Sequence, residues 1–255
     1  MITFENSPVT IGGNTVLASS ASIAISNPRR GIKQLGTAGF AGQVMDGPMA
    51  GNISVSYYIT GADSAIRGLF GAGASAGIQV FDVSVGKYRC YDAVMESLSL
   101  SIEPYSAVTC EVSMSFYNGY DQGGSDGSLS APDDVIHGGA ATVTSDLLWS
   151  SDIVSCTYSL NQSVSPVYLL GELVPDGYSI EDTTVEVEIA GTGLGSILDF
   201  EGICDGYAEG SITLAGVCDP TLGGSISFSG NVIDPQVTVA PGEEINGSLT
   251  VFGTF

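Results

Sequence analysis

The chain has 255 residues, of which 28 are Asp or Glu and only six are Lys or Arg, so its formal net charge is −22. That charge argues against tight binding to a nucleic-acid backbone or an anionic membrane surface, because such partners are bound through Lys and Arg. Apolar residues make up 44% of the chain without a run of 18, which supports folded cores and not a membrane span. The N-terminus lacks the pattern of a signal peptide, so we expect folding in a cytoplasm.

The charge is distributed unevenly along the chain. The first 89 residues hold all six basic residues and four acidic ones, which gives +2, whereas the other 24 carboxylates have no Lys or Arg near them in the sequence. Such an imbalance is tolerated when a neighbouring subunit supplies the opposite charge or when salt screens it. It predicts assembly or a high-salt setting, with three clustered cations as candidate inter-subunit charge contacts: Arg29, Arg30 and Lys33.

Alternating apolar and polar residues predict β-strands along the whole chain. A period of two is typical of antiparallel sheets that pack on one face and leave the other face polar. Only two stretches, 63–70 and 194–200, favour short helices. The predicted strands, in chain order, lie at 53–59, 98–102, 110–116, 185–189 and 249–251.

The second half of the chain repeats the pattern of the first. The strand at 53–57 matches 185–189, and Val112 matches Leu249, at offsets of 132 and 137 residues. The order of strand, long loop, strand, short helix and strands around a Pro turn is kept. We expect an all-β fold of two tandem antiparallel β-sandwich or barrel domains, each with one short flanking helix and a long loop, at 1–120 and 138–255, joined by a Gly/Asp/Ser-rich linker at 121–137.

No group of residues predicts catalysis. Nucleophilic catalysis needs a base, and the single imidazole, His137, lies at the end of the linker. The five Cys residues lack C-x-x-C spacing, which favours buried thiols over a zinc site. Neighbouring carboxylates such as Glu186 and Glu188 arise by chance in so acidic a chain. We therefore predict a protein that is not an enzyme and has no cofactor or metal.

Apolar residues in a long Gly-rich loop indicate a partner. The segment 36–50 joins two predicted strands and carries Phe40, Val44, Met45 and Met49. Loops of this length are uncommon in compact domains unless they are functional, and exposed apolar residues mark interaction sites. We expect this loop to contact another chain.

In this arrangement of segments the chain resembles the major tail tube proteins of long-tailed bacterial and archaeal viruses. The resemblance implies β-sandwich domains with a flanking helix, in rings of six domains that stack into a tube around one inner β-barrel. A duplicated chain would form rings of three with pseudo-sixfold symmetry. The residues that carry the resemblance are Asn27–Gly36, the loop to Met49, Gly51–Tyr58 and the helix after Gly61, repeated at Tyr158–Leu170, Gly171–Asp182 and Thr183–Ile189.

The resemblance also implies where the protein acts. It would belong to the virion tail after assembly in the host cytoplasm. Its partners would be further copies of itself, tape-measure, tail-terminator and distal tail or baseplate proteins, without membrane contact. Viral DNA would pass through without specific binding, because an acidic or Ser/Thr-rich wall does not hold phosphates as a basic wall would.

Two sets of site residues follow from the resemblance. Ring stacking would fall to the loop at 36–50 and to its counterpart in the second half, and the lumen would be lined by the polar sides of the matched strands. These polar sides equally fit a surface that faces outward into solvent. The stacking residues are Phe40, Val44, Met45, Met49, Leu173, Val174 and Tyr178, and the lumen residues are Ser54, Ser56, Tyr58, Thr184, Glu186 and Glu188.

A different class of protein fits the same pattern. A two-domain β-sandwich adhesin or carbohydrate-binding module of a virion or cell surface would also be all-β and non-enzymatic. It would need a shallow aromatic patch on its surface. The candidates are Tyr88, Tyr91, Tyr105, Phe116, Tyr117 and Tyr120.

Overall fold

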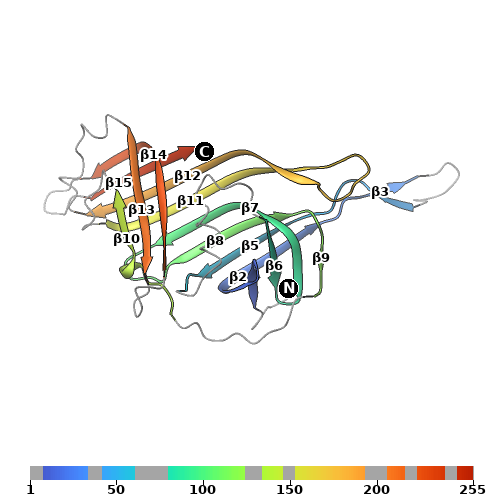
Figure 1. Cartoon of the computed structure of the whole chain (residues 1–255), viewed down its shortest axis with the longest axis horizontal. Coiled ribbons are helices and arrows are strands. Elements are labelled where there is room, and N and C mark those ends of the chain that lie inside the picture. Colours follow the sequence, from blue (N-terminus) through green and yellow to red (C-terminus); the bar gives the residue numbers. More distant parts are fainter. Residues whose placement is uncertain are drawn as a thin grey trace.

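The computed structural model describes residues 8–33, 42–60, 80–123, 134–145, 153–192, 206–215, 223–238 and 246–254. Both predicted helices, 63–70 and 194–200, lie outside these residues, as does Phe40. The described residues are organised almost entirely as antiparallel strands (Figure 1). The all-β class is therefore correct.

The strands fall into two series along the chain. The first half contains β1 (Val9–Ile11), β2 (Asn14–Ser26), β3 (Arg29–Ile32), β4 (Gly42–Met45), β5 (Ala50–Tyr58), β6 (Val80–Val85), β7 (Tyr88–Ile102), β8 (Thr109–Phe116) and β9 (Tyr120–Asp121). The second contains a 3₁₀ turn η1 (Gly138–Ala140), then β10 (Thr142–Ser145), β11 (Ile153–Val167), β12 (Gly177–Thr192), β13 (Tyr207–Ala215), β14 (Gly223–Thr238) and β15 (Asn246–Thr254). All five strands predicted from alternation are confirmed.

The first half closes into a barrel of six strands. Its order is β7-β6-β1-β2-β5-β8, and β8 returns to pair with β7. Alternate residues of each strand point inward, as in β5, where Ile53, Val55 and Tyr57 are buried while Asn52 and Ser54 are exposed. Closure leaves few open strand edges and encloses one apolar core.

The second half repeats these pairings in an open form. The pairs β2–β5, β5–β8, β6–β7 and β7–β8 recur as β11–β12, β12–β15, β13–β14 and β14–β15. In the described part of the chain β10 pairs with β13 but not with β11, so this sheet does not close. The registers correct one detail of the predicted repeat, because Val112 corresponds to Val251 and not to Leu249.

The two halves share one continuous sheet. β11 pairs with β7 over six residue pairs, from Cys156 opposite Ile102 to Asn161 opposite Ser97. Figure 1 shows the strands of both halves side by side across this joint. Together they form a sheet of 13 strands, and the buried residues of both halves belong to one hydrophobic cluster.

A hairpin extends from each half at the same side of the sheet. β3 and β4 form a separate two-stranded ribbon that projects beyond the barrel (Figure 1). β11 and β12 pair with each other as far as Val167 opposite Gly177. The segment predicted as a loop, 36–50, therefore contains strand β4, because Gly42–Met45 pairs with Arg29–Ile32.

The end of the predicted linker packs on the first half. Ile136 is buried, and its N–H donates a hydrogen bond of 2.8 Å to the carbonyl of Ile59. The flanking Val135 and His137 form isolated bridges with first-half residues. Residues 134–137 therefore belong structurally to the first barrel.

Candidate functional site

One face of the shared sheet is polar across seven neighbouring strands. Residues directly opposite one another in paired strands place their side chains on the same face. The pairings of β2, β5, β8, β7, β11, β12 and β15 therefore define rows of side chains that cross both halves. One row is Ser20, Ser56, Glu111, Ser99, Ser159, Glu186 and Phe252, the next is Leu17, Tyr58, Thr109, Ser101, Thr157, Glu188 and Thr250, and a third is Ser22, Ser54, Ser113, Ser97, Asn161 and Thr184, so that the only apolar members, Leu17 and Phe252, lie on the two outer strands.

We call the surface made by these three rows the polar face. It contains all six residues predicted to line a lumen, three from each half. The sequence could place Ser54 and Glu186 on polar sides of their own strands, but not on a common surface. The β7–β11 joint brings them together, and the two hydroxyl oxygens Ser99 Oγ and Ser159 Oγ lie 3.5 Å apart across it.

The opposite side of the same strands fixes the orientation of the polar face. The residues that alternate with the three rows, such as Val112, Leu98 and Leu160, are buried in the apolar cluster. A shift of one residue in any pairing would exchange the two faces, so burial of these side chains keeps the polar side outward from the core.

The charge of the polar face is negative. Its three rows carry the carboxylates of Glu111, Glu186 and Glu188 among hydroxyls and contain no Lys or Arg. Glu186 and Glu188, the two carboxylates that β12 adds to these rows, are both exposed. The wide spacing of carboxylates among Ser and Thr makes this a hydrated surface with weak repulsion for phosphate.

A cluster of exposed aliphatic residues marks the end of the β11–β12 hairpin. Leu173 and Val174, predicted for ring stacking, are exposed here. The sequence reasoning missed Leu169 and Leu170, although two adjacent Leu residues after a Pro in a polar turn were a visible signal. We call this cluster the apolar tip, made of Val167, Leu169, Leu170, Leu173 and Val174.

The other stacking candidates lie in different settings. Val44 is exposed on β4, and Met49 is partly buried just before β5. Met45 pairs with Arg29 through the backbone, and the position of Phe40 lies outside the described residues. Val44 shares the exposed surface of the ribbon with Ile32, so this hairpin also presents aliphatic side chains.

Tyr178 contacts the first half of its own chain. Its hydroxyl donates a hydrogen bond of 3.3 Å to the carbonyl of Asp92, and its ring centroid lies 6.0 Å from that of Tyr117. Burial and the nearby Asp92 raise the pKa of Tyr178 to about 12. Tyr178 therefore holds the β11–β12 hairpin against the first half.

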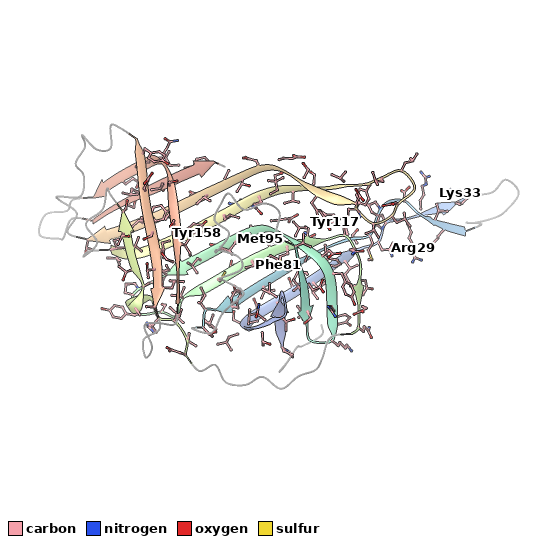
Figure 2. The ribbon with its side chains drawn as sticks, viewed as in Figure 1. Arg29, Lys33, Phe81, Met95, Tyr117 and Tyr158 are labelled. Atoms are coloured by element: carbon pink, nitrogen blue, oxygen red, sulfur yellow. The ribbon has the colours of Figure 1, made fainter. Side chains whose placement is uncertain are left out.

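The predicted inter-subunit cations lie on or next to β3. Figure 2 shows Arg29 and Lys33 on the projecting ribbon. Arg30 Nε lies 3.4 Å from Asp46 Oδ1, and both side chains are largely exposed. An exposed ion pair contributes little to stability, so the cationic ribbon remains available to an acidic surface.

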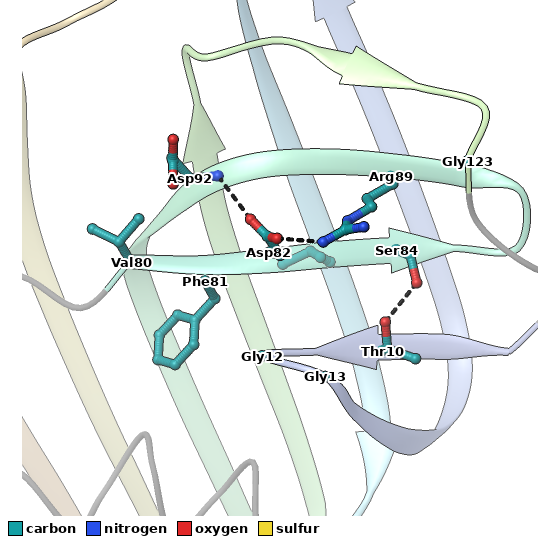
Figure 3. A pocket seen from close by; sticks show the side chains of 11 residues that line it. Thr10, Gly12, Gly13, Val80, Phe81, Asp82, Ser84, Arg89, Asp92 and Gly123 are labelled. Atoms are coloured by element: carbon teal, nitrogen blue, oxygen red, sulfur yellow. Dashed lines mark hydrogen bonds and ion pairs between the residues drawn. The ribbon is translucent and has the colours of Figure 1, made fainter.

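A cleft of about 680 Å³ lies between β1, β6 and β7 (Figure 3). Its charged groups already have partners: Arg89 Nη2 lies 2.7 Å from Asp82 Oδ2, the backbone N–H of Asp92 donates to Asp82 Oδ1 at 3.4 Å, and Asn118 Nδ2 donates to the Asp92 carboxylate. The hydroxyls of Thr10 and Ser84 bond each other at 2.5 Å. Satisfied polar groups leave no evident ligand preference.

Chemically reactive residues are scattered in the described part of the chain. It contains no group of three or more His, Cys, Asp or Glu side chains placed to hold a metal ion. His137 is exposed, and Cys90, Cys110 and Cys156 are buried and are not joined in disulfides. The described residues also include no helix long and apolar enough to cross a membrane.

The candidate aromatic patch does not form one surface. Phe116 is fully buried, and Tyr117 packs on Tyr178. Tyr88 begins β7, whereas Tyr105 follows the other end of that strand. The geometry gives this set of residues no common face.

Comparison with known proteins leaves the polar face as the main guide to function. No protein-family model and no curated protein matches the chain.

Proposed function

We propose that this chain is the structural subunit of a viral tail tube, through which DNA passes during ejection. It would polymerise into stacked rings of three chains with pseudo-sixfold symmetry. The observation that carries the proposal is the polar face, because it runs without interruption through both halves of the chain. A tube wall built from repeated domains needs such a surface.

The chemistry of the polar face suits the passage of DNA. Duplex DNA carries one charge per roughly 1.7 Å of its axis, and Lys or Arg would hold it by counterion release. Hydroxyls with sparse carboxylates at Glu111, Glu186 and Glu188 keep the surface wet and repel phosphate weakly. DNA would slide along such a wall without being retained.

The surfaces at the two hairpins support self-assembly. The apolar tip exposes five aliphatic side chains, and such a patch favours burial against another chain. The ribbon of β3 and β4 carries Arg29 and Arg30, whereas the second half of the chain has no basic residue. A nearly neutral first half with a cationic ribbon and a strongly acidic second half favour neighbours that alternate around a ring.

Further proteins enter this proposal only as partners of the assembled tube. These partners would be tape-measure, tail-terminator and distal tail or baseplate proteins. The protein would be located in the virion tail, after assembly in the host cytoplasm.

Electron microscopy of the purified protein tests the proposal. At high concentration, we expect rings and tubes with threefold symmetry. Changing Leu170→Asp and Leu173→Asp should leave rings but prevent their stacking, because two carboxylates would then enter the apolar tip. The matched control, Thr213→Asp with Ser227→Asp, adds the same charge on exposed positions of β13 and β14 and should still form tubes. A chain that remains monomeric in low and high salt would contradict the proposal.

A further inference from the structure

β2 has a long strand edge without a partner in the described structure. In the closed barrel each strand has a neighbour on either edge, so β1 and β5 occupy opposite edges of β2. β1 covers only Asn14–Val16, whereas β5 pairs along the rest of the strand. On the β1 side, no described residue pairs with residues 18–26. An uncharged open edge of this length is a template for a strand from another chain.

The corresponding edge in the second half has a partner. β11 corresponds to β2, because both pair with the matched strands β12 and β5. The edge of β11 that faces away from β12 pairs with β7, from Cys156 to Asn161. The partner that suits a β2-type edge is therefore a β7-type strand.

β7 offers this edge because the strand that pairs with it there changes from β6 to β11 along its length. Val94 pairs with Val80 of β6 and with Ser115 of β8, which places β6 and β8 on opposite edges. Beyond Val94, one edge of β7 stays paired with β8. On its other edge, β11 replaces β6 as the pairing strand.

β14 presents the same kind of edge, but without a described partner. Asn231 pairs with Tyr207 of β13 and with Phe252 of β15, so these strands also lie on opposite edges. The contact with β13 ends when the Val232 N–H donates to the carbonyl of Gly206 at 2.9 Å. From Ile233 to Thr238, β14 continues along β15 alone.

We propose that β2 of one chain pairs with β14 of a second copy, as β11 pairs with β7 within the chain. The matched registers place Ser22 opposite Ile233 and Ser20 opposite Gln236, because the template pairs are Ser159 with Ser99 and Thr157 with Ser101.

Pro235 is compatible with this contact. It lies in the irregularity between Ile233 and Gln236, where the register of β14 against β15 already shifts. Proline is tolerated at bulges and on edge strands, since its missing N–H interrupts the ladder there. The contact therefore consists of two short stretches of pairing on either side of Pro235.

The proposed contact is heterologous, because each chain gives β2 to one neighbour and β14 to another. Such contacts form a ring when the rotation closes and a filament when it does not. The inference rests on the proposed function only for the closure of the ring. The polar face would then continue from chain to chain, since Ser22 and Ile233 both lie on that side of the sheet.

Thiol cross-linking between two variants tests the contact. One chain carries Ser22→Cys, and a second, with a size tag, carries Ile233→Cys. Both have Cys204→Ser and Cys218→Ser, and the described native thiols are buried. With a short bifunctional thiol reagent we expect a dimer of unlike chains. The control, Ser26→Cys mixed with Ile233→Cys, lies about 13 Å further along β2 and should give little dimer.

Three outcomes would overturn the inference. Dimers of Ser22→Cys alone would show two β2 edges paired with each other, and equal yields with Ser26→Cys would show that the register is wrong. If the variants fold poorly, hydrogen exchange of the unaltered chain decides: amides in 18–26 must exchange more slowly in the assembled protein than in the monomer, and equal rates refute the contact. If cross-linking gives dimers of the two unlike chains but electron microscopy shows no tubes, the strand contact stands and only the proposed tube is refuted.

Discussion

The polar face makes a prediction about DNA retention. Each chain places three carboxylates on this face, so a ring of three chains carries nine. Changing Glu186→Lys and Glu188→Lys shifts the charge of the face from −3 to +1 per chain and adds six ammonium groups per ring. Both positions are exposed, so the effect on folding should stay within about 0.5 kcal/mol.

The expected magnitude follows from counterion release. Each ammonium that contacts a phosphate makes the slope of log K, the DNA-binding constant, against log salt more negative by about 0.9. Six contacts therefore give a slope of about −5. The variant tubes should therefore retain DNA at low salt. Their binding constant for DNA should fall by about 10³ between roughly 50 and 200 mM salt. The unaltered tubes should retain no DNA at either salt concentration.

The assay is sedimentation of assembled tubes with linear or circular duplex DNA. Linear DNA can thread into a tube, whereas circular DNA cannot. The variant should therefore retain linear DNA selectively. The control, Glu103→Lys with Glu209→Lys, makes the same charge change at exposed positions that are not part of the three rows of the polar face. The lumen assignment would be refuted if the Glu186/Glu188 variant retained linear and circular DNA equally. It would also be refuted if intact tubes of this variant retained no DNA at low salt.

Two predictions concern the stability of the fold. Gly51→Ala should destabilise the chain by about 1–3 kcal/mol, because the new methyl group would meet the Phe116 ring, whereas Gly224→Ala has open space and should change urea unfolding little. Burial raises the pKa of Cys90 to about 11 and of Cys156 to about 12, so the unfolded chain loses these protons first. The contribution of these two thiols to stability should be present in full below pH 9 and be lost between pH 9 and 12, so the urea midpoint should fall over that range. A urea midpoint that rises over that range would contradict the assignment.

The strands were predictable because burial alternates along them. Ile53, Val55 and Tyr57 point into the barrel and the polar residues between them point out, so the sequence period of two records the fold directly. The same period recurs at Val185 and Val187, which made the repeat visible. The polar sides of both strands could therefore be assigned from the sequence.

The pairing partners could not be predicted, because alternation does not encode which strands meet. Ser99 and Ser159 face each other across the two halves, yet nothing in a Ser-rich strand distinguishes one polar neighbour from another. The sequence predicts a loop where β4 lies, because Gly42–Met45 is short and follows a Gly-rich segment. The role of Tyr178 was missed because its partner, Asp92, lies 86 residues away.

The difference between the closed first half and the open second half bears on the order of folding during synthesis. The barrel is closed by strands that all lie within residues 9–116, so it can form once that part of the chain has left the ribosome. The later strand β11 then meets an existing edge on β7 and needs no separate nucleus. The first half thus supplies an edge for β11, whereas β10, β13 and β14 join the shared sheet through β15, the last strand to be synthesised.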